Sequence, residues 1–198
     1  MNEEEFKAAL SASDAVDFCH ETLFDDVNWY FENSDEVDVA GGYQEFREVV
    51  SEQIGVDPVE INLAGSSKYG FSLSPDVDKT FSAFHAESDL DLIIVSDDLF
   101  RAVWSELLEA YHAGYRWILK RHCREVFRKF SLLSPTIEYK TTLLRARAKN
   151  LSGISREIFL KTGSSRQLKY RIYESRDAAV AYHAAGLDQI KRRIEDDA

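Results

Sequence analysis

In VEINLAGSSKYGFSLSPDVDKTFSAFHAESDLDLIIV, residues 59–95, two apolar runs are separated by a long polar segment. The first run is Val59–Ala64 and the second is Leu90–Val95. Short apolar runs bounded by turn residues are typical of buried strands. We therefore expect two strands of one small sheet, joined by an inserted loop or hairpin that contains Pro75.

Two acidic residues, Asp89 and Asp91, flank Leu90 at the start of the second run. Side chains alternate between the two faces of a strand, so these carboxylates are predicted to point the same way. Two carboxylates this close repel each other unless protons or a cation neutralise them. Mg²⁺ prefers oxygen ligands and often also binds substrate phosphates, which makes it the predicted metal at Asp89 and Asp91.

The first run ends at Gly65 and Ser66. Glycine allows a sharp turn and a close approach of the backbone to a ligand, and serine adds a hydroxyl and a backbone N–H. Such a turn before a helix is suited to binding an anion. A phosphate at Gly65 and Ser66 and a metal at the two aspartates together favour phosphoryl chemistry.

These residues resemble a known family. Gly65-Ser66, the later Gly70, and Ser88-Asp89-Leu90-Asp91-Leu92 are similar to the glycine-serine and Asp-x-Asp motifs of the nucleotidyltransferase superfamily, especially its minimal, antitoxin-like members. The resemblance implies Mg²⁺-dependent transfer of a nucleoside monophosphate from a nucleoside triphosphate, such as ATP, to an acceptor. It implies that Ser66 contacts the triphosphate and that Asp89 and Asp91 hold the metal. The 22 residues between Ser66 and Asp89 exceed the usual spacing in this family.

Active members of the family carry a third carboxylate on a later strand. Residues 167–173, QLKYRIY, alternate as a strand, but their polar face offers Lys169 and Arg171. Glu174, just past this strand, is the nearest acid and is our candidate for the third catalytic residue. Glu138 is a second candidate if residues 136–142 are extended.

Charge is distributed unevenly along the chain. Residues 1–100 carry 4 Lys and Arg against 24 Asp and Glu, whereas residues 101–198 carry 20 against 11. The two halves are predicted either to attract each other across one fold or to place basic groups around a triphosphate. Lys68 is the predicted phosphate contact within the acidic half. A basic stripe at Arg116, Lys120, Arg124 and Arg128 is either a solvated face or a face that contacts anions.

The chain is predicted to form a single α+β domain over residues 1–198, with a small mixed sheet flanked by helices. Residues 1–57 form an N-terminal helical extension, with helices at 3–33 and 43–54 and a possible restart at Ser13-Asp14. Residues 58–97 carry the two motif strands. Residues 98–198 form a basic helical region with a long helix at 98–130, in which Gly114 is a possible break or bend, a helix at 137–149, the strand at 167–173 and a closing helix at 176–194.

Several other classes of protein are excluded by the sequence. It contains no run of 18 apolar residues, and its acidic start, MNEEEF, differs from a signal peptide, so a cytoplasmic protein that binds no membrane is expected. Cys19 and Cys123 are expected to be free thiols. The five histidines form no zinc motif, and His85 is the one predicted near the site.

Two functions remain open. The first is an enzyme that transfers a nucleoside monophosphate to a hydroxyl of a protein, an RNA or a small molecule. The alternative is a catalytically inactive module with the nucleotidyltransferase fold that binds a protein partner, as in an antitoxin-like or phage-defence subunit. An RNA-binding role for residues 116–149 is the third interpretation.

Overall fold

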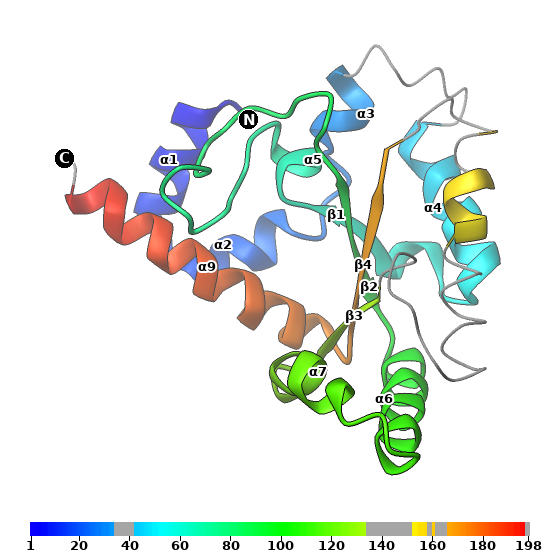
Figure 1. Ribbon diagram of the computed structural model, residues 1–198. Coiled ribbons are helices and arrows are strands. Elements are labelled where there is room, and N and C mark those ends of the chain that lie inside the picture. Colours follow the sequence, from blue (N-terminus) through cyan, green and yellow to red (C-terminus); the bar gives the residue numbers. More distant parts are fainter. Residues whose placement is uncertain (34–41, 134–151, 158–159, 161–165, 197–198) are drawn as a thin grey trace.

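The computed structural model describes residues 1–33, 42–133, 152–157, 160 and 166–196 (Figure 1). The described part of the chain is a mixed α+β structure, as the sequence predicts. Its helices are α1 Glu3–Ala12, α2 Ala15–Thr22, α3 Trp29–Asn33, α4 Gly42–Ile54, α5 Ser66–Tyr69, α6 Asp97–His112, α7 Trp117–Phe127 and α9 Arg176–Asp196, with a 3₁₀ turn at Pro58–Glu60. Its strands are β1 Ile61–Ala64, β2 Leu90–Val95, β3 Phe130–Leu133 and β4 Leu168–Tyr173.

The strands form a mixed sheet in the order β1-β2-β4-β3. β1 pairs antiparallel with β2, and Ala64 lies opposite Asp91. β2 and β4 are parallel, with Asp91 opposite Lys169 and Ile93 opposite Arg171. β3 pairs antiparallel with β4 at the other edge. The end of β1, the start of β2 and the start of β4 therefore meet at one end of the sheet.

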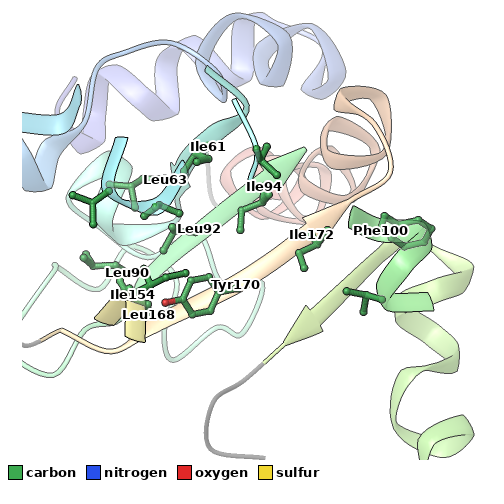
Figure 2. Packing of buried hydrophobic residues seen from close by; sticks show 14 of the residues in the cluster. Ile61, Leu63, Leu90, Leu92, Ile94, Phe100, Ile154, Leu168, Tyr170 and Ile172 are labelled. Atoms are coloured by element: carbon green, nitrogen blue, oxygen red, sulfur yellow. The ribbon is translucent and has the colours of Figure 1, made fainter. Parts of the chain in front are cut away.

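One face of the sheet forms the larger core. Apolar side chains on alternate positions of β1, β2 and β4 point to this face, because successive residues of a strand alternate sides. Figure 2 shows them packed together: Ile61, Leu63, Leu90, Leu92, Ile94, Leu168, Tyr170 and Ile172. Buried residues of α4 and α6, among them Phe46 and Phe100, cover this face.

The opposite face of the sheet packs against α9. Ala64, Ile93 and Tyr173 from the strands are buried with Ala178 and Ala179 from the first turn of α9. In Figure 1, α9 and α2 lie on this side of the sheet, and α4 lies on the other. The alternation of the strands thus separates an apolar core from a face that also carries Asp91, Lys169 and Arg171.

The N-terminal helices begin at side-chain caps. Asn2 and Glu5 form a capping box on α1, in which each side chain accepts a hydrogen bond from the other residue's backbone N–H. Asp14 caps α2 by accepting from the N–H of Val16. Both helices pack against α9, and Phe6 and Leu10 of α1 are buried in that contact. The helix predicted over residues 3–33 is therefore three helices, restarted at Asp14 as expected.

The long helix predicted over residues 98–130 is two helices, divided at Gly114, where a break or bend was predicted, and it ends before residue 130. α6 ends at His112, Gly114 has φ +100°, and α7 starts at Trp117. α7 ends at Phe127, and Lys129, with φ +58°, leads into β3, which the sequence did not predict. The predicted helix at 43–54, the motif strands, the strand at 167–173 and the closing helix are confirmed. The predicted helix at 137–149 and Glu138 lie outside the described residues.

In the part of the chain that the structure describes, no helix combines the length and the apolar character needed to cross a membrane.

Candidate functional site

The turn after β1 lies directly beside Asp91. Gly65 has φ +61°, a conformation that favours glycine, and α5 starts at Ser66. A Cβ added to Gly65 would lie 3.5 Å from Oδ2 of Asp91, because Ala64 and Asp91 are paired across β1 and β2. The structure thus brings Gly65, Ser66 and Asp91 together, as the sequence predicts.

Asp89 and Asp91 share one side of the sheet with two cationic residues of β4. Lys169 forms an ion pair with Asp89. A guanidinium nitrogen of Arg171 lies 3.3 Å from Oδ1 of Asp91. The parallel register of β2 and β4 produces both pairs, because residues two apart on each strand point to the same side.

A cavity of about 790 Å³ opens on this side of the sheet. We call it the cationic cavity, because four cationic side chains line it: Arg128, Lys129, Lys169 and Arg171. Asp91 is the acidic residue in its lining, and Gly65 and Ser66 form part of its wall. The wall on the side of α2 and α9 combines the small or apolar residues Cys19, Leu23, Ala178, Ala181, Ala185, Gly186 and Leu187 with the polar residues Tyr182, His183 and Gln189.

Two pKa shifts describe the electrostatics of this cavity. Burial lowers the pKa of Arg171, but Asp91 and other neighbouring groups outweigh it, so the pKa is raised and the guanidinium stays charged. Burial, together with the charge of Arg171, lowers the pKa of His183 to about 3. His183 also lies 3.3 Å from the hydroxyl of Tyr173. It is therefore neutral near pH 7 and adds no charge to the cavity.

Lys129 and Arg128 come from the turn between α7 and β3. Lys129 is 2.6 Å from Glu174, and this bond raises the pKa of the lysine. Arg128 is exposed and lies at the end of the predicted basic stripe. That stripe therefore contributes one side chain to the cavity wall, whereas Lys120 and Arg124 lie outside it.

The donor atoms at Asp89 and Asp91 do not fit the predicted Mg²⁺ site. Each carboxylate already contacts a cationic side chain, and a metal placed between them would lie close to Lys169 and Arg171, where like charges repel. Across the described ranges, no group of three or more His, Cys, Asp or Glu side chains is arranged to hold a metal ion.

Lys68 lies elsewhere than the sequence predicts. Its side chain is buried away from the cavity lining, and Nζ donates to the carboxylate of Asp25 at 2.7 Å. Nζ also donates to the backbone carbonyls of Asp25 at 3.1 Å and Val27 at 3.0 Å. Burial lowers the pKa of Lys68, and the bond to Asp25 opposes that shift. Lys68 therefore anchors α5 to the segment before α3 instead of contacting a phosphate.

Glu174 is also not brought to the two aspartates. In the parallel register, Tyr173 lies opposite Val95, so Glu174 follows the last residue of β4. Asp91 lies opposite Lys169, near the first residue of β4. Glu174 instead binds Lys129. Lys169 and Arg171, and no carboxylate of β4, lie next to Asp89 and Asp91 on the polar side of that strand.

Arg166 holds the segment before Asp89, a role the sequence did not indicate. Its guanidinium donates to the carbonyls of His85 at 2.5 Å and Ala86 at 2.6 Å, and lies 4.8 Å from the ring centre of Phe84. His85 is thereby fixed in the inserted loop and does not line the cationic cavity. A long-range contact of this kind has no local sequence signal.

The two thiols differ in environment. Cys19 is buried in the cavity wall, and burial raises its pKa to about 12. Cys123 is exposed on α7. Because the thiolate is the reactive form, Cys19 is not a nucleophile near neutral pH.

No family model, no curated protein and no solved structure matches this chain. We therefore infer the function from the geometry of the cationic cavity.

Proposed function

We propose that this protein binds a nucleoside triphosphate in the cationic cavity as a non-catalytic, nucleotidyltransferase-like module. The observation that carries the proposal is that the Gly65-Ser66 turn and four cationic side chains line one cavity. Arg and Lys are the residues that most often contact phosphate oxygens, and Arg does so with two parallel hydrogen bonds. A cavity of about 790 Å³ lies in the range of small-molecule sites.

The polar and the apolar parts of the cavity lining suit the two parts of a nucleotide. Lys169 and Arg171 of β4 line the cavity together with Ser66, and Arg128 and Lys129 line it from the turn between α7 and β3, so these groups would neutralise the phosphates. The wall on the side of α2 and α9, with Leu23, Ala181 and Ala185, offers apolar surface for a base. The ligand that fits is thus an anion with an apolar, planar group.

Thermal or urea unfolding in the presence of ATP tests this proposal. A ligand that binds the folded state, present at about 100 times its Kd, raises the free energy of unfolding by about 2.7 kcal/mol. Arg128→Gln should weaken ATP binding, because it removes an exposed cationic group from the cavity without disturbing an interior contact. Arg124→Gln is the matched control, since Arg124 lies four residues earlier, on α7, and outside the cavity. Unchanged stability with ATP, GTP, CTP and UTP would contradict the proposal.

A second candidate is the transfer of a nucleoside monophosphate to a hydroxyl of a protein, an RNA or a small molecule. One observation favours it: Oδ1 of Asp91 is buried and, within the described residues, accepts no hydrogen bond, since Arg171 lies 3.3 Å away as an ion-pair partner only. Incubation with α-labelled nucleotide and Mg²⁺ tests this candidate. Label transfer that is lost in an Asp89→Asn, Asp91→Asn double variant would replace the non-catalytic proposal with the enzymatic one.

A further inference from the structure

The charges around Asp89 and Asp91 suggest how the proposed nucleotide would bind, and this inference rests on the proposed function. Asp91 lines the cavity and Asp89 lies outside its lining, two residues away, and carboxylates this near to a phosphate ligand must be neutralised, or the ligand is repelled. In this chain the neutralising groups are present as side chains, because Lys169 pairs with Asp89 and Arg171 pairs with Asp91. The site therefore already holds two positive charges where it would otherwise need a metal ion.

These cations are held in place by the fold. Lys169 and Arg171 both belong to β4, which is hydrogen-bonded to β2 along its whole length. The guanidinium of Arg171 also lies 5.8 Å from the ring centre of Tyr182 on α9. The side chains of Arg171 and Asp91 are 21% and 24% exposed, so neither charge is well solvated when its partner is removed. Separating such a pair leaves an uncompensated, partly buried charge, which is strongly unfavourable.

A metal would have to displace these contacts. It would bind Asp89 and Asp91 only after Lys169 and Arg171 had moved away from these carboxylates, which costs both ion pairs. The same two cations also line the cavity that the phosphates would enter. They can therefore contact the carboxylates on one side and phosphate oxygens on the other.

We propose that this site binds the triphosphate of a nucleotide without a divalent cation, with Lys169 and Arg171 taking the place of the metal. The free nucleotide, and not its Mg²⁺ complex, is then the preferred ligand. Mg²⁺ lowers the affinity, because it neutralises phosphate oxygens that the two side chains would otherwise contact.

Calorimetric titration of the full chain with ATP, once in EDTA and once in excess MgCl₂, tests the inference. We expect tighter binding in EDTA than in MgCl₂, and no heat or stabilisation from MgCl₂ alone. Binding that is equal in the two buffers or tighter in MgCl₂ would overturn the inference and leave the proposed function intact. Absence of binding in both buffers would overturn the proposed function and the inference with it.

A charge-neutral variant sharpens the test. Lys169→Gln with Arg171→Gln should weaken ATP binding in EDTA by about tenfold or more, because two charge-assisted contacts are lost. It should also make ATP binding depend on Mg²⁺, since Asp89 and Asp91 are left without counter-charges. Lys120→Gln with Arg124→Gln, which removes the same charge outside the cavity, should do neither.

Thermal unfolding shows whether the double variant is folded. If it is not, Lys169→Gln alone is compared with the unmodified protein, because the Lys169 side chain is 44% exposed and the fold depends little on it. Lys169→Gln should shift the ratio of the ATP affinities in EDTA and in MgCl₂ in the same direction as the double variant does, toward tighter binding in MgCl₂. An unchanged ratio in a folded variant would overturn the inference.

Discussion

Replacing Phe6 by alanine is expected to lower the free energy of unfolding by about 4 kcal/mol, the largest loss among the substitutions considered. Phe6 is fully buried, and its ring centre lies 5.1 Å from that of Phe18 and 5.2 Å from that of Tyr69. It is also 5.3 Å from Phe71. The substitution removes these edge-to-face contacts and leaves a cavity that the rigid surroundings cannot fill.

Urea unfolding, followed by circular dichroism and by fluorescence, measures this loss. The matched control is Phe127→Ala, since the Phe127 side chain is 88% exposed and its removal should change stability by no more than about 0.5 kcal/mol. Both signals should report one transition, because Phe6 joins α1 to the residues that follow α5. A separate early transition, or a loss as small as that of Phe127→Ala, would show that residues 1–33 fold apart from the rest.

The second large effect is expected at Lys68. Lys68→Met keeps the length of the apolar stem but removes the ammonium group that binds Asp25 and two backbone carbonyls. Those acceptors are left without their donor, and removing one partner of a buried pair costs about 3 kcal/mol or more. The Asp25 side chain is 39% exposed and regains some solvation, so we expect about 3 kcal/mol.

Lys79→Met is the control for this change. Lys79 and its partner Asp76 are 69% and 51% exposed, and an exposed pair of this kind contributes at most about 1 kcal/mol. Because Lys68 lies outside the cationic cavity, the affinity for ATP should remain within about threefold in conditions where the variant is folded. A folded Lys68→Met variant that no longer binds ATP would instead show that Lys68 contacts the phosphates.

The sequence was informative where the signal is local. Asp89 and Asp91 were expected on one side of a strand because of the two-residue period, and Lys169 and Arg171 were assigned to one polar face for the same reason. Their pairing was not foreseeable, because nothing in either segment specifies that β2 and β4 are neighbours. The same limit applies to Lys68, whose partner Asp25 is distant in the sequence.

The errors in the helical region have a different cause. Phe130 continues the apolar stripe of the preceding residues, so periodicity alone extended the helix through it. The backbone at Gly114 and Lys129, both with positive φ, ends α6 and α7 earlier. β3 is only four residues long and gains its stability from pairing with β4, which a local pattern does not contain. Tertiary context, more than local preference, defines this part of the fold.

The packing of α1 and α2 against α9 has a consequence for synthesis of the chain. Residues 3–22 leave the ribosome well before α9, which starts at Arg176 and packs against α1 and α2. Until α9 is made, Phe6 can contact Phe18, Tyr69 and Phe71, but the side of α1 and α2 that faces α9 has no cover, and short isolated helices are marginal in water. The nascent chain therefore exposes this apolar side of α1 and α2 until α9 is synthesised, which gives chaperones a surface to bind.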